Sequence, residues 1–130
     1  MSRIILERRI SAIPLSPKGG SLLAEPIMTG QDKMPVVRKS DEIYHLEDFE
    51  CGSVVLSVTY LHHGQNTKGH SHENVEAYYV AQGQGEMELG STKRQLTAGD
   101  FVYVDCGVFH RVWNCGVVTL VVVCCWEKQK

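Results

Sequence analysis

The sequence has no cluster of basic residues, and this absence bears on its partners. Its 130 residues include 13 lysines and arginines against 15 aspartates and glutamates, which gives a formal net charge of −2. Proteins that bind a nucleic-acid backbone concentrate positive charge on one surface. We therefore expect no nucleic acid among the partners of this protein.

Long apolar runs are also absent. Val117 to Trp126, interrupted only by Thr119, is far too short to span a bilayer. The first nine residues place charges among a few aliphatic side chains and lack the apolar core of a signal peptide. The five cysteines are odd in number and include no C-x2-C pair, unlike a secreted disulfide framework. We expect no membrane partner and a cytoplasmic location.

Segments with helical periodicity are scarce. Short apolar runs instead alternate with turn residues, and the chain has 12 glycines, a pattern that is typical of an all-β sandwich or barrel. The length predicts one domain over residues 1–130, with an N-terminal arm and edge strands in 1–40 and a barrel core in 41–130. We expect strands at residues 4–10, 22–29, 43–46, 53–62, 75–82, 85–90, 93–97, 101–105, 109–114 and 117–126, and no helix. The last of these strands is apolar at nearly every position, so we expect it at the barrel centre with both faces covered.

One short segment gathers three side chains that can bind a metal. Its pattern is G-x5-H-x-H-x3-E-x6-G, which contains Gly64, His70, His72, Glu76 and Gly83. Residues two apart in a strand share a face, so the two imidazoles point the same way, and the carboxylate joins them if the strand continues. The two glycines mark places where the chain turns or approaches another backbone closely.

A second segment supplies a third imidazole. It reads G-x5-D-x-G-x2-H-x3-N from Gly99 to Asn114 and contains His110. Three imidazoles and one carboxylate suit a divalent transition metal and suit calcium poorly. We expect one ion, manganese or iron foremost, with zinc, nickel, cobalt or copper as alternatives. The predicted ligands are His70, His72, Glu76 and His110. Four protein ligands on an octahedral ion leave two positions for water, substrate oxygens or dioxygen.

The two segments resemble the two signature motifs of the cupin superfamily. The first matches at every fixed position, whereas the second has Asp105 where cupins usually carry a proline. The resemblance covers about residues 54 to 126. It implies a double-stranded β-helix, a small jelly-roll barrel with the metal inside one open end. It also implies a homodimer.

A more local similarity suggests a substrate. The stretch T-K-G-H-x-H resembles that of the archaeal cupin-type phosphoglucose isomerases, and it implies that Thr67 and Gly69 lie near a sugar phosphate. Lys68 has the parity of His70 in a regular strand, so its ammonium would face the mouth of the site and attract an anionic group, with a plain surface lysine as the alternative. Glu76 is then the first candidate for the base that moves a proton between adjacent carbons. Tyr78 is the second, for positioning or proton transfer, with a purely structural role in the core as its alternative. The chain is shorter than those enzymes and has fewer residues between the second histidine and the glutamate.

Three functions remain open at this point. The first is a metal-dependent enzyme of the aldose–ketose isomerase type, which acts on a small sugar phosphate or a related polar metabolite. The second is a dioxygenase with a small organic substrate, since the same four ligands can hold a redox-active ion. The third is a module without turnover that uses the metal to hold a small acid or sugar. All three predict a small-molecule ligand.

Overall fold

The structure, a computed structural model, describes residues 30–34, 36, 38–40 and 44–128. The chain divides into two units, residues 1–34 and residues 35–130. The described part of the first unit holds a single 3-10 turn, η2, at Gln31–Lys33. The strands predicted at 4–10 and 22–29 lie outside the described residues, so the single domain remains a prediction. No helix in the described part of the chain is long and apolar enough to cross a membrane.

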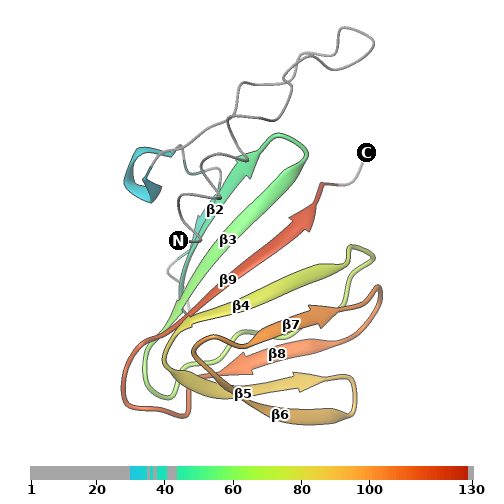
Figure 1. Ribbon diagram of the computed structural model, residues 1–130. Helices are drawn as coiled ribbons and strands as arrows, with labels where there is room; N and C mark the ends of the chain where they lie inside the picture. Colours follow the sequence, from blue (N-terminus) through green and yellow to red (C-terminus); the bar gives the residue numbers. More distant parts are fainter. Residues whose placement is uncertain (1–29, 35, 37, 41–43, 129–130) are drawn as a thin grey trace, which may run out of the picture. The chain divides into compact units, whose positions relative to one another are not determined.

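The second unit contains two antiparallel sheets that face each other (Figure 1). The larger sheet has the strand order β1-β2-β3-β9-β4-β7, and the smaller has the order β6-β5-β8. The strands are β1 Arg38–Ser40, β2 His45–Cys51, β3 Val54–Leu61, β4 Glu76–Gln82, β5 Gln84–Leu89, β6 Thr92–Thr97, β7 Phe101–Val104, β8 His110–Trp113 and β9 Leu120–Glu127. The prediction of an all-β jelly-roll fold is confirmed.

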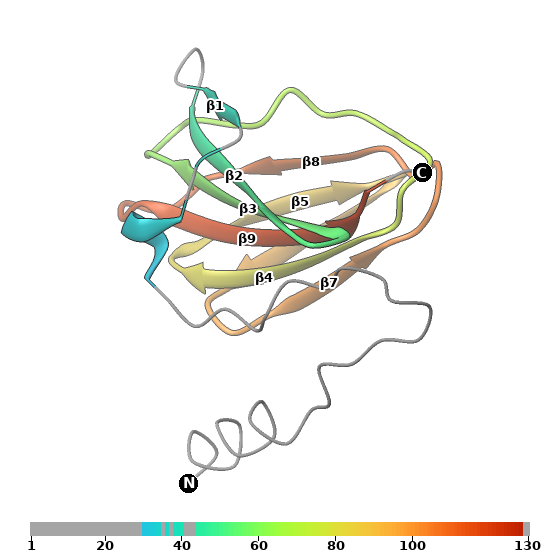
Figure 2. The same cartoon turned by 90° about the horizontal axis from the view of Figure 1, so that it is seen from above.

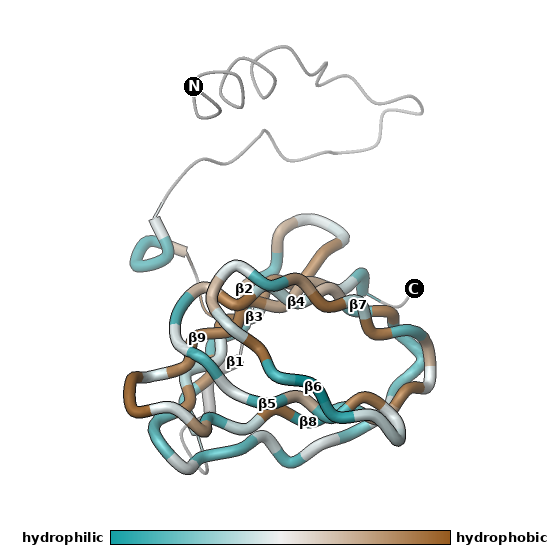
Figure 3. The backbone as a smooth tube through the Cα atoms, turned by 60° about the horizontal axis from the view of Figure 1, so that its bottom comes forward, coloured by the Kyte–Doolittle hydropathy of each residue, from teal (hydrophilic) through white to brown (hydrophobic). Residues whose placement is uncertain are grey.

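The core lies between the two sheets because alternate residues of their strands point inward. In β4 the buried and exposed positions alternate from Glu76 to Val80, as the two-residue period of a strand requires. β6, in contrast, buries only Leu96 and is largely hydrophilic, drawn teal in Figure 3. The core cluster comprises Leu61, Tyr78, Val80, Met87, Leu96, Val104, Val112, Leu120, Val122 and Cys124.

The apolar strand near the C-terminus occupies the predicted central position. β9 pairs with β3 on one side and with β4 on the other, as Figures 1 and 2 show. Only one of its faces is fully buried, however, and the other is half-buried. The strand also begins at Leu120 rather than at Val117, which is 89% exposed.

β9 starts later than predicted because of Asn114, the last residue of the second motif. Asn114 is 2% exposed. Its side-chain amide donates to the carbonyls of Leu61 at 2.7 Å and Val118 at 2.9 Å, and its Oδ1 accepts from the amide of Gly116 at 2.8 Å. These bonds hold residues 116–118 as a loop, so the apolar character of Val117 and Val118 does not extend the strand.

β2 differs most from the prediction. It was expected at 43–46 but runs from His45 to Cys51, and β1 was not predicted at all. The sequence of β2, H-L-E-D-F-E-C, carries three acidic residues and so lacks the regular alternation by which strands are recognised. It forms a strand because all seven of its residues pair with β3.

Candidate metal centre

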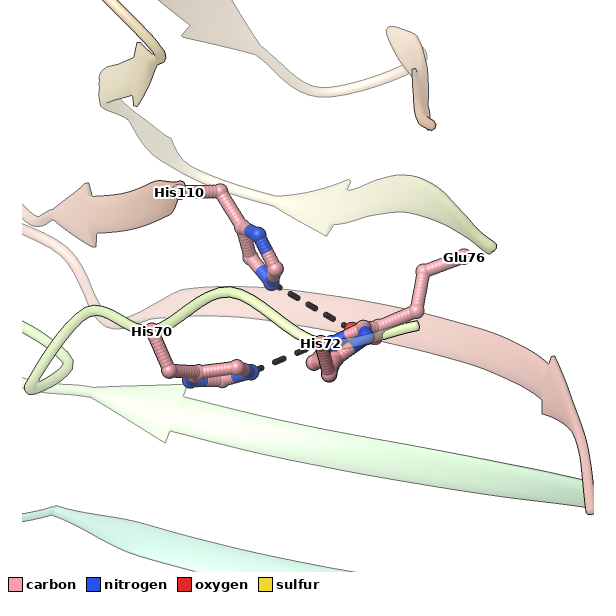
Figure 4. A group of neighbouring side chains, drawn as sticks. All are labelled: His70, His72, Glu76 and His110. Carbon is pink, nitrogen blue, oxygen red and sulfur yellow. Dashed lines mark hydrogen bonds and ion pairs between the residues drawn. The ribbon is translucent and has the colours of Figure 1, made fainter. Parts of the chain in front are cut away.

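The four predicted ligands come from three places in the chain. His70 and His72 lie in the extended segment before β4, Glu76 begins β4, and His110 begins β8 (Figure 4). The strand does not continue from His70 to Glu76, since residues 73–74 form a bend and His70 makes only an isolated bridge with His110. The side chains nevertheless converge, because this bridge and the bend place them around one point.

Their ligand atoms form a compact cluster. The donor atoms of His70, His72, Glu76 and His110 all lie within 4.8 Å of one another, so the four residues can hold a metal ion. Glu76 Oε1 is the centre of the cluster: it contacts His72 Nε2 and lies 3.3 Å from His110 Nε2 and 4.0 Å from His70 Nε2. Glu76 and His110 are buried, whereas the side chain of His70 is 56% exposed. The cluster is thus closed on one side and open on the other.

Two of the imidazoles are oriented by hydrogen bonds on their far nitrogens. His72 Nδ1 donates to the carbonyl of Asn74, and His110 Nδ1 donates to that of Val108, both at 2.9 Å. A carbonyl accepts only from a protonated nitrogen, so in the neutral imidazole the Nε2 lone pair faces the cluster. His110 Nε2 is buried and makes no hydrogen bond of good geometry. A divalent ion among the four donors would satisfy this atom, and the donor set therefore fits a transition metal.

The charges in the cluster are coupled. Burial alone would raise the pKa of Glu76, but the contact with His110 and the charge of His72 outweigh it, and the pKa is lowered. Burial alone would lower the pKa of His110, but its contacts with the Glu76 carboxylate and the Val108 carbonyl outweigh that effect, and the pKa is raised. In the absence of an ion, a proton on His110 therefore balances the negative charge of the Glu76 carboxylate. A bound metal ion would balance the same charge.

The turn before His110 departs from the usual cupin motif but is held in another way. Asp105 stands at the position of the usual proline, and its Oδ1 accepts from the amide of Cys106 at 2.7 Å. Its carbonyl accepts from the amide of Val108 at 3.2 Å, and the amide of Gly107 donates to the carbonyl of His72 at 2.8 Å. The aspartate side chain thus restrains the turn that a proline ring would otherwise stiffen, and the turn is tied to the first motif.

A cavity of about 170 Å³ opens beside the cluster. It is lined by Tyr44, Leu46, Ser57, Thr59, Leu61, Thr67, His70, His72, Glu76, Tyr78, Val112, Val122, Cys124 and Trp126. Tyr78 belongs both to this lining and to the core. Burial raises the pKa of Tyr78, and the neighbouring Cys124 and Glu76 side chains raise this pKa further, so the phenol stays neutral.

The three residues predicted to contact substrate have different positions. Thr67 lines the cavity, and its Oγ1 accepts from the amide of Val112 at 3.0 Å. Lys68 is exposed and does not line the cavity. Gly69 has a φ of +81°, and a Cβ atom there would lie 2.6 Å from the ring of Phe109. This glycine therefore shapes the backbone immediately before His70.

Several residues that line the cavity were not predicted from the sequence. Ser57 and Thr59 lie on β3, and Cys124 and Trp126 lie on β9. The sequence carries one signal for the first pair: two small hydroxyl residues at alternate positions of an otherwise apolar strand share a face. That face is the buried one, since Ser57 and Thr59 are 3% and 7% exposed.

Comparison with known proteins agrees with the fold and the site. Residues 57–126 match the family Cupin_2, the cupin domain. This chain is a cupin. Its relatives include the uncharacterized protein MJ1618 of Methanocaldococcus jannaschii. The two sequences are 30% identical over 105 residues, and the alignment covers 76% of this chain and 84% of the relative.

Solved structures share the fold of this cupin. One is a predicted oxalate decarboxylase of Thermotoga maritima, with a TM-score of 0.69, 16% identity, and coverage of 79% of this chain and 100% of that one. Another is a conserved protein with a double-stranded β-helix domain from Klebsiella pneumoniae, with a TM-score of 0.66, 24% identity, and coverage of 79% and 90%. At these identities the likeness shows the barrel alone.

Proposed function

We propose that this cupin is a metal-dependent enzyme whose substrate is a small organic molecule that binds the ion through oxygen atoms. The observation that carries the proposal is the position of three of the four ligands, His70, His72 and Glu76, at the wall of the cavity, with the His70 side chain more than half exposed. Structural metal sites are closed, whereas catalytic sites keep a coordination position open. The expected ion remains manganese or iron, with zinc, nickel, cobalt and copper as alternatives.

The cavity favours a small substrate. Its volume of about 170 Å³ lies below the range of roughly 300–1,000 Å³ that accommodates drug-sized ligands. Within the described part of the chain, none of the lining residues is a lysine or an arginine, the side chains that usually bind phosphate. Lys68, which was expected to serve that role, lies outside the lining. The lining therefore favours an uncharged metabolite over a sugar phosphate.

Oxidation by dioxygen is the reaction that we favour. The lowered pKa of Glu76 makes its carboxylate a weak base, and the raised pKa of Tyr78 keeps its phenol protonated, so neither group is suited to take a proton from carbon near neutral pH. When bound, a redox-active ion such as iron would supply electron transfer to dioxygen and polarise the substrate oxygens. The protein would orient His72 and His110 through their Nδ1 bonds and exclude water with the apolar part of the lining.

An aldose–ketose isomerase is the second candidate. It is supported by the proximity of the neutral Tyr78 phenol to the Glu76 carboxylate, whose charge helps to raise the pKa of the phenol. Through this contact the phenol would hold the carboxylate in place while the latter takes a proton from the carbon beside a substrate carbonyl. The substrate would be an unphosphorylated hydroxycarbonyl compound.

One experiment separates the three functions. Metal-free protein would be reloaded with iron and tested for oxygen uptake with β-diketones and phenols, and reloaded with manganese and tested for carbon-bound proton exchange with small aldoses in deuterated water. Oxygen uptake lost in His72→Ala supports the oxygenase, and proton exchange supports the isomerase. Ligand-induced thermal shifts without either reaction point to a binding module. A protein that retains no metal contradicts the proposal.

A homodimer is part of the proposal, and exposed aromatic side chains support it. Phe101 and Tyr103 of β7 are 79% and 64% exposed, and the ring of Phe101 lies 4.9 Å from that of Tyr79 on β4. These three side chains, called the aromatic patch below, lie on the outer face of the larger sheet, since Val104 between the sheets has the opposite parity. Exposed apolar patches commonly mark protein interfaces. A cytoplasmic location also remains a proposal, in keeping with the five free thiols.

A further inference from the structure

The wall of the cavity on β3 carries two hydroxyl groups that the metal site does not use. Ser57 and Thr59 line the cavity and are 3% and 7% exposed. Neither hydroxyl makes a hydrogen bond to another residue in the described part of the chain. A buried hydroxyl normally has a hydrogen-bond partner, because a hydroxyl without one has given up its bonds to water and gained none in return. A molecule bound in the cavity could therefore supply the hydrogen-bond partners of these two hydroxyls.

Strand register places these hydroxyls away from the metal ligands. Ser57 pairs with Cys124 of β9, and Cys124 pairs with Tyr78 of β4. Two inter-strand spacings amount to about 10 Å, so Ser57 lies across the cavity floor from the strand that carries Glu76. A molecule with its oxygens at the metal ligands would direct its other end toward Ser57 and Thr59.

The described lining of this cavity disfavours an anion. Among the lining residues that the structure describes, none is a lysine or an arginine. A carboxylate or phosphate at this end would lose its hydration without gaining a cationic partner. A neutral hydroxyl, carbonyl or amide would gain hydrogen bonds from two preformed positions.

Thr67, the other threonine in the lining, has a different role. Its Oγ1 already accepts from the amide of Val112 at 3.0 Å, and its own amide donates to the carbonyl of Val112 at 2.9 Å. These two bonds join the segment before the metal ligands to β8. Thr67 therefore supports the backbone of the site, and Ser57 and Thr59 are the hydroxyls left for a ligand.

We propose that Ser57 and Thr59 form a recognition point for an uncharged hydrogen-bonding group at the end of the substrate opposite its metal-binding oxygens. The inference rests on the proposed function, because the metal must hold the other end of the molecule. It narrows the substrate class to small oxygen-chelating compounds with a neutral polar tail, and it predicts that an anionic tail is rejected.

Three hydroxypyranones test this directly, because they chelate a metal through the same ketone and hydroxyl oxygens and differ at one ring position. That position carries a methyl group in allomaltol, a hydroxymethyl group in kojic acid and a carboxylate in comenic acid. Zinc-loaded protein would be titrated with each compound by calorimetry. We expect kojic acid to bind roughly fivefold more tightly than allomaltol, the effect of about one hydrogen bond, and comenic acid to bind most weakly.

Variants assign the preference to the two hydroxyls. Three variants are needed: Thr59→Val, which is nearly isosteric, Ser57→Ala, and the double variant. All three should bind zinc and allomaltol as tightly as the wild type. The double variant should lose the preference for kojic acid over allomaltol. Thr92→Val, on the exposed strand β6, is the matched control and should behave like the wild type. Because Thr59→Val removes only a hydroxyl, it remains informative if the double variant fails to fold.

The outcomes also distinguish this inference from the proposed function. If comenic acid binds as tightly as kojic acid, or the preference for kojic acid survives in the variants, the recognition point is wrong while the metal-dependent function stands. If the protein binds no zinc, or binds zinc but none of the three chelators, the proposed function fails and the inference fails with it.

Discussion

His70 and His110 exchange both of their backbone hydrogen bonds. The amide of His70 donates to the carbonyl of His110 at 3.1 Å, and the amide of His110 donates to the carbonyl of His70 at 3.0 Å. The two residues thus form a hydrogen-bonded antiparallel pair, whose side chains point to the same face, and their rings lie 4.5 Å apart. His70 and His110 are about forty residues apart in the sequence, and their pairing joins the two motifs at the candidate metal site.

Removing one ligand at the open side of the cluster should abolish metal retention. His72 is the suitable position, since its side chain is 25% exposed and its loss leaves the core intact. We expect His72→Ala to keep the fold and to lose most of its bound metal, measured by elemental analysis of protein purified without chelators. His62→Ala is the control, because His62 is exposed and bonds to Thr119 rather than to the cluster. Full metal content in His72→Ala would contradict the assignment.

Metal binding should stabilise the protein more strongly as the pH rises. In the metal-free protein the pKa of His110 is raised. The associated stabilisation is present below the unfolded-state value of about 6.5 and is lost as the pH rises through the folded-state value. The ion needs the neutral imidazole, so the metal-loaded protein gains stability over the same range.

The lowered pKa of Glu76 makes the stability depend on pH in the opposite direction. Its contribution is present above the ordinary carboxyl pKa and is lost as the pH falls through the lowered value, well below this range. The measurement is the increase in Tm caused by excess zinc, followed from pH 6 to pH 8. We expect the increase to grow with pH, and an increase that is constant or falls would show that His110 carries no proton to displace.

The buried amide of Asn114 should be a major contributor to stability. Its three hydrogen bonds, to Leu61, Val118 and Gly116, hold the end of β3 and the loop before β9 together. Asn114→Ala leaves these backbone groups without partners, and we expect it to lower the free energy of unfolding by about 3 kcal/mol. Urea denaturation measures the change.

Asn74→Ala provides a matched control for that loss. The side chain of Asn74 makes one exposed hydrogen bond, to the carbonyl of Glu127 at 2.9 Å. We expect this substitution to change the free energy of unfolding by less than about 1 kcal/mol. Equal effects of the two substitutions would mean that the amide of Asn114 is not what holds the loop.

The aromatic patch should carry the homodimer. Phe101→Lys places a charge in its centre without disturbing the core, because Phe101 is 79% exposed. We expect a monomer for this variant and a dimer for the wild type by light scattering. Val117→Lys, at a residue that is 89% exposed on a loop, should remain dimeric. A monomeric wild type, or a variant that stays dimeric, would rule out this interface.

The local sequence was sufficient to predict the four candidate ligands but not to predict every strand. His70, His72, Glu76 and His110 lie at motif spacings, and the structure brings their donor atoms together even though no continuous strand joins His70 to Glu76. The acidic strand β2 was recognised only over its first two residues, since its pairing with β3 outweighs its own composition.

The sequence by itself determined the family, the all-β class and the set of side chains that could hold a metal ion, because each of these is encoded in residue types at short, fixed spacings. Only the tertiary structure decided what surrounds the metal site: the exclusion of Lys68 from the cavity and the inclusion of Ser57 and Thr59. These residues reach the site through the pairing of β3 with β9. Such a contact joins segments some sixty residues apart, and its register depends on the packing of the whole barrel rather than on any local pattern.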